Sequence, residues 1–84
     1  MFLGKRALFR AMVKNSQHNL IHQLSETMDS IWRMKLYQED AQKDNRPEEV
    51  EFWKKFKETL EKQVAMLKEQ LEKVISKEGL DISL

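Results

Sequence analysis

Apolar residues recur at alternating spacings of three and four along the second half of the chain. The repeat consists of Val50, Trp53, Leu60, Val64, Leu67, Leu71 and Val74, with Lys57 at the one interrupted position. This is the a/d spacing of a heptad, which places these side chains along one side of an α-helix. The pattern predicts a helix from about residue 47 to residue 78. Its central part should hold the fold together through Leu60, Val64, Leu67 and Leu71.

The first half of the chain has a less regular apolar stripe. It consists of Leu20, Ile21, Leu24, Met28, Ile31 and Leu36. This stripe predicts another helix, which should end near Asp44. Gly79 follows Lys77 and Glu78 and is typical of a residue that ends a helix. No alternating pattern of the kind that marks a β-hairpin is present, so we expect an all-α protein.

Pro47 is the only proline and separates the two stripes. Proline disrupts a helix interior but suits the first turn of a helix. Asn45 is a candidate N-cap for the second helix, and Glu48 follows it three residues later. We therefore expect a turn near residues 44–47 that folds the two helices into an antiparallel hairpin.

The register of this hairpin can be predicted, because facing residues have numbers that add up to a constant. Leu24 with Leu67 and Ile31 with Leu60 both add up to 91. Ile21 with Leu71 and Met28 with Val64 both add up to 92. The same register places Lys35 opposite Lys57, where both stems could extend outward to water or an acidic group could lie between them.

Several large apolar residues lie outside this seam, and exposed apolar patches of this kind usually mark interfaces. The candidate association residues are Trp32, Leu36, Phe52 and Phe56. Two hairpins that pack together would form a four-helix bundle, which would bury both the seam and the apolar residues outside it. Since a twofold dimer is the commonest closed assembly, we expect a homodimer.

The first 25 residues carry the basic side chains of Lys5, Arg6, Arg10 and Lys14 and no acidic residue. From Glu26 onward, acidic residues outnumber basic ones by 14 to 11. Residues 1–15 therefore form a separate basic amphipathic segment, which could contact an acidic protein or an anionic membrane, act as a targeting segment, or pack on the bundle. Residues 16–78 form the hairpin, and residues 79–84 form a short apolar tail that could cover the bundle end or dock into a partner. Nucleic-acid binding is disfavoured, because the long arms are net acidic.

Composition narrows the chemistry further. The chain has no cysteine, so disulfides and thiolate metal sites are excluded, and 35% of its residues are charged. It contains no glycine-rich phosphate loop, no nucleophile motif and no apolar run long enough to span a membrane. We expect a protein without catalytic activity or cofactor in the cytoplasm, with an organelle or a membrane surface as alternative locations.

His18, His22 and Glu26 are the candidate metal ligands, because a spacing of four places them on one helix face. The stretch 37–67, in which Pro47 opens the second helix and Ala65-Met66-Leu67 lies late in it, resembles half-ferritin cargo proteins. That resemblance implies a metal site built between paired helices. However, Val64 stands where the ligand histidine would be, and the chain contains no Glu-x-x-His motif.

Taken together, these patterns favour a non-catalytic interaction, assembly or regulatory module that associates with itself through helices. The alternative is a ferritin-like or other metal-binding bundle assembled between chains.

Overall fold

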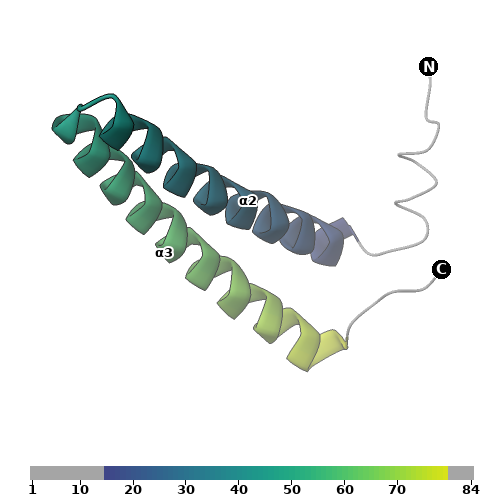
Figure 1. The fold of residues 1–84 in the computed structure, drawn as a ribbon. Coiled ribbons are helices and arrows are strands. Elements are labelled where there is room, and N and C mark those ends of the chain that lie inside the picture. Colours follow the sequence, from purple (N-terminus) through teal and green to yellow (C-terminus); the bar gives the residue numbers. More distant parts are fainter. Residues whose placement is uncertain (1–14, 80–84) are drawn as a thin grey trace, which may run out of the picture.

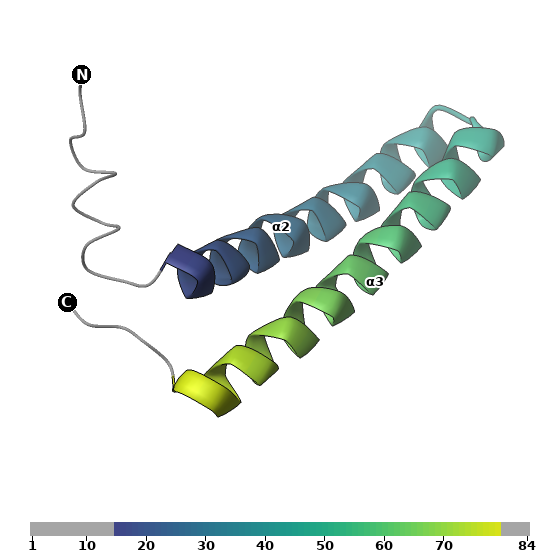
Figure 2. The ribbon, with the colours of Figure 1, turned by 180° about the vertical axis from the view of Figure 1, so that it is seen from behind.

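The computed structural model describes residues 15–79, which form two long α-helices joined by a short turn. Helix α2 spans Asn15–Lys43 and helix α3 spans Pro47–Glu78. The helices run in opposite directions side by side, with the turn at one end of the pair (Figure 1). The view from behind shows the same pair, with the start of α2 and the end of α3 both at the end opposite the turn, where the two ribbons are farther apart (Figure 2). The described residues contain no strand, which confirms the predicted all-α hairpin.

Burial along α3 follows the predicted heptad. Leu60 is buried near the middle of the helix. The other seam positions are half-buried: Val50, Trp53, Lys57, Val64, Leu67, Leu71 and Val74. The sequence therefore predicted both the extent of this helix and the side that packs on α2, including the half-buried Lys57 at the interrupted position.

The seam of α2 differs from the predicted stripe. The residues that are buried or half-buried at heptad spacing are Gln17, Leu20, Leu24, Thr27, Ile31, Met34, Gln38 and Ala41. In contrast, Ile21 is 43% exposed and Met28 is 51% exposed. The prediction that these two residues face Leu71 and Val64 was therefore wrong. It failed because polar side chains occupy several seam positions of α2, so apolarity alone does not identify its buried side.

Corrected in this way, the two seams match in a single register. Leu24 with Leu67 and Ile31 with Leu60 keep the predicted total of 91, and Met34 rather than Lys35 takes the position across from Lys57. The contact between the rings of Tyr37 and Trp53, whose centroids lie 5.0 Å apart, agrees with this register. Lys35 is exposed.

The turn between the helices is closed by backbone hydrogen bonds. The amide of Arg46 donates to the carbonyl of Ala41 at 2.9 Å, and the amide of Asn45 donates to the carbonyl of Gln42 at 3.1 Å. Asn45 has a positive φ of 57°. This is a Schellman motif, in which asparagine is the commonest substitute for glycine at the left-handed position.

Asn45 thus ends α2, whereas the sequence had suggested that it caps α3. The residue at the N-cap of α3 is Arg46, which makes no side-chain capping hydrogen bond. Pro47 opens the helix as predicted, and Glu48 and Glu49 occupy its first turn, where negative charge complements the helix dipole. The guanidinium of Arg46 donates to Glu49 at 3.0 Å. This hydrogen bond, together with the negative charges of Glu49 and Asp44, raises the pKa of Arg46.

A hydrogen bond between the two helices closes the open end of the hairpin. Gln17, near the start of α2, is 1% exposed, and its Nε2 donates to the carbonyl of Gly79 at 2.8 Å. Gly79 ends α3 with φ 78° and ψ 160°, a conformation that favours glycine, so the predicted helix stop is confirmed.

We expect Gln17→Ala to lower the free energy of unfolding by about 1–2 kcal/mol, because it leaves the carbonyl of Gly79 without this buried donor. The exposed Gln42 provides the control, since Gln42→Ala should change stability by less than about 0.5 kcal/mol. Urea unfolding followed by circular dichroism measures both. Equal effects of the two substitutions would contradict the structural role of Gln17.

Candidate interaction surface

An aromatic cluster lies on α3 near the turn, with Trp53 at its centre. The ring centroid of Trp53 lies 5.0 Å from that of Tyr37 on α2 and 4.8 Å from that of Phe52. Phe56 lies 6.0 Å from Trp53 and 6.1 Å from Phe52. Trp53 is half-buried in the seam, but Phe52 is 54% exposed and Phe56 is 42% exposed. The cluster therefore joins the interior of the hairpin to its surface.

These two phenylalanines begin a continuous uncharged stripe along α3, which we call the α3 flank. All of its members are exposed and they follow one another at spacings of three and four: Phe52, Phe56, Thr59, Gln63, Met66 and Gln70. This spacing places them along one side of the helix, next to the seam. Among the large apolar residues of the described hairpin, Met66 has the highest exposed fraction, 69%, and it lies in this stripe.

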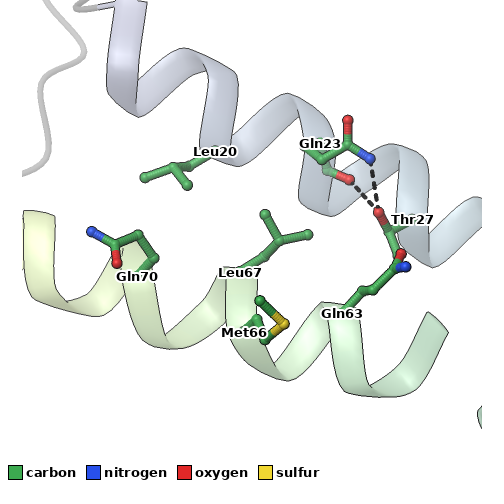
Figure 3. A pocket seen from close by; sticks show the side chains of 7 residues that line it. All are labelled: Leu20, Gln23, Thr27, Gln63, Met66, Leu67 and Gln70. Atoms are coloured by element: carbon green, nitrogen blue, oxygen red, sulfur yellow. Dashed lines mark hydrogen bonds between the residues drawn. The ribbon is translucent and has the colours of Figure 1, made fainter. Parts of the chain in front are cut away.

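The α3 flank borders a groove between the two helices with a volume of about 410 Å³. The groove is lined by Leu20, Gln23, Thr27, Gln63, Met66, Leu67 and Gln70. In Figure 3, Leu20 and Leu67 extend into the space between the helices, with glutamine side chains around them. Among the described residues that line this groove none is charged, so it suits an apolar or amide-bearing side chain better than an ion.

Thr27 is buried beside this groove, and its hydroxyl group is fully hydrogen-bonded. Its hydroxyl donates to the carbonyl of Gln23 at 2.8 Å and accepts from the Nε2 of Gln23 at 3.0 Å (Figure 3). Both bonds lie within α2, so Thr27 can occupy a seam position at little cost. This explains how a polar residue replaces an apolar one in the packed side of α2.

Trp32 and Leu36 lie on a different surface from Phe52 and Phe56. Trp32 is 61% exposed and Leu36 is 39% exposed. Because a helix turns by about 100° per residue, both project from the side of α2 away from Gln23, which faces the groove. Together with Ile21 and Met28 they form a second apolar stripe, the α2 flank. The four candidate association residues thus belong to two surfaces rather than to one continuous patch.

The structure keeps His18 and His22 close together on α2, with ring centroids 5.8 Å apart. His22 and Glu26 are exposed, and His18 is half-buried. Within residues 15–79, no group of three or more histidine, aspartate or glutamate side chains is arranged to hold a metal ion. Any metal site on this helix face would therefore need ligands from elsewhere, such as a second chain.

Two predicted regions lie outside the described residues. These are the basic segment with Lys5, Arg6, Arg10 and Lys14, and the apolar tail of residues 80–84. Neither of the two described helices is long and apolar enough to cross a membrane.

The groove and the uncharged character of the α3 flank were not predicted from the sequence. The sequence nevertheless contained the pattern of the α3 flank, because Thr59, Gln63 and Gln70 continue the spacing of the phenylalanines and Met66. No protein-family model, curated protein or solved structure matches this chain.

Proposed function

We propose that this protein is a non-catalytic assembly module whose helical hairpin associates with a second copy to form a four-helix bundle. The observation that carries this proposal is the imbalance between buried and exposed apolar residues. Within the described part, the buried apolar residues are Met34, Ala41 and Leu60. Eight large apolar residues remain exposed: Ile21, Met28, Trp32, Leu36, Tyr37, Phe52, Phe56 and Met66.

Association would supply the core that a pair of helices cannot form alone. Transfer of a large apolar side chain from water to a buried site contributes about 1.5–3 kcal/mol, so partial burial of a few such residues offsets the cost of forming a dimer. Small chains commonly gain stability by oligomerisation. A four-helix bundle covers one face of each hairpin, and the α3 flank and the α2 flank each offer an apolar stripe for such a face.

We expect sedimentation equilibrium of the full chain to give the mass of a dimer at micromolar concentration, with dissociation on dilution. A dimer buries its interface reversibly, so helicity and thermal stability should rise with protein concentration. A chain that remains monomeric across the micromolar range would contradict the proposal.

The metal-binding bundle is the second candidate and rests on the proximity of His18 and His22. Elemental analysis of untagged protein bears on it directly, since stoichiometric zinc or iron would favour this function over simple assembly.

The proposed location is the cytoplasm, because a chain without cysteine needs no oxidising environment to fold. An acidic protein or an anionic membrane is the partner we propose for the basic residues of the first segment.

A further inference from the structure

We propose that the α3 flank is the interface between two copies and that the two α3 helices run antiparallel across it. This inference rests on the proposed self-association and adds its surface and its orientation. The partner is a second copy of the same chain, because the flank has complementary charges at its two ends.

The first argument is the segregation of charge around α3. Between Phe52 and Gln70, every position of the α3 flank is uncharged although all are exposed. On the opposite side of the same helix, every position from Glu51 to Glu72 is charged except Ala65. An exposed helix face in a monomer has no need to exclude charge, whereas the buried centre of an interface does.

The second argument is the charge at the ends of this stripe. Continued by spacings of three or four, the stripe reaches Glu48 and Glu49 in the first turn of α3 and Lys73 and Lys77 near its end. A twofold axis near Gln63 would bring Glu49 of each copy next to the lysines of the other. A parallel pair would instead place Glu49 beside Glu49 and lysine beside lysine, which is unfavourable. The interaction between the two helix dipoles also favours the antiparallel arrangement over the parallel one.

The present partners of these charged groups do not oppose such pairing. Glu49 contacts Arg46 at 3.0 Å and Glu69 contacts Lys73 at 3.4 Å, and all four side chains are at least half exposed. Exposed pairs of this kind are weak, so these groups can exchange or share partners at little cost. In the antiparallel arrangement the Gln63 amide of one chain would face the Gln63 amide of the other. Two such amides can each donate a hydrogen bond to the other and accept one from it.

A charge exchange tests the orientation. In the full chain, Glu49→Lys should weaken the dimer about tenfold or more, because both ends of the interface then carry lysine against lysine. The combined variant Glu49→Lys, Lys73→Glu, Lys77→Glu should return the dissociation constant to within about threefold of the original value. Glu51→Lys is the matched control, since Glu51 is exposed in the same part of the helix but lies on the charged side of α3. It should change the constant less than about threefold.

Cross-linking provides a second test, because the chain contains no native cysteine. A short bismaleimide should link Gln63→Cys into a dimer, while Ala65→Cys on the charged side and Gln70→Cys away from the axis should remain unlinked. A parallel pair would link Gln70→Cys as well and would overturn the orientation.

These experiments separate the two proposals. A monomeric parent chain would remove the proposed function and this inference together. A dimer in which Glu49→Lys has no effect and Gln63→Cys is not linked would leave self-association intact and overturn the α3 interface. The flank would then be covered differently, for example by the apolar and basic residues of segment 1–14.

Discussion

Substitution of Met34 by alanine should destabilise the hairpin by about 2–3 kcal/mol, while the same substitution at Met28 should cost less than about 0.5 kcal/mol. The two methionines lie on the same helix, six residues apart. Met34 is 5% exposed and Met28 is 51% exposed. Removal of the Met34 side chain leaves a cavity in the seam beside the half-buried Lys57, whereas water already surrounds much of Met28.

This pair is a sharp test because apolar periodicity had placed Met28, and not Met34, in the seam. Urea unfolding at one fixed protein concentration measures both variants, since association would otherwise add a concentration-dependent contribution to stability. Circular dichroism should show both variants fully helical before unfolding. Equal destabilisation, or a larger effect at Met28, would mean that α2 presents a different side to α3.

How much of this fold the sequence predicted depends on the helix. In α3 nearly every seam position is apolar, so the helix, its bounds and its buried side all follow from the spacing. In α2 the seam includes the polar residues Gln17, Thr27 and Gln38. Gln17 donates to the end of the partner helix and Thr27 donates within α2, while Gln38 is only half-buried. Their presence shifts the apparent stripe toward apolar residues that remain in water. Apolarity identifies a packed side only where the packed side excludes polar residues.

The turn shows the same division between position and mechanism. Pro47 correctly marks the start of the second helix, because its ring fixes φ and its missing amide costs nothing there. The role of Asn45 depends instead on a backbone angle. Asparagine is favoured both as an N-cap and in the left-handed position that ends a helix, and its φ of 57° decides between them. Composition alone could not make that choice.

The candidate surface was predicted in part. The exposure of Trp32, Leu36, Phe52 and Phe56 follows from their positions outside the seam. Their division into two flanks depends on the register and on the side of α2 that packs against α3, which the sequence placed incorrectly. Once the seam is known, the uncharged α3 flank can be recognised in the sequence from Phe52 to Gln70.

The double substitution Phe52→Glu, Phe56→Glu should abolish self-association, with a dissociation constant raised at least about 100-fold. In an interface centred on the α3 flank, each copy would bury two carboxylates without partners, and such groups are costly to remove from water. Because Phe52 is 54% exposed and Phe56 is 42% exposed, the isolated hairpin should tolerate the change. It should lose about 1 kcal/mol from the ring contacts with Trp53. Sedimentation and circular dichroism should therefore report a helical monomer.

Two controls connect this loss to the α3 flank and not to added negative charge. Ala65→Glu with Ser76→Glu adds two carboxylates on the exposed, charged side of α3 and should leave the dimer intact. Trp32→Glu places a carboxylate on the α2 flank, where the side chain is 61% exposed, and should also preserve the dimer. If Trp32→Glu disrupts association while the Phe52 and Phe56 variant does not, the α2 flank is the interface. The uncharged stripe of α3 then needs another explanation.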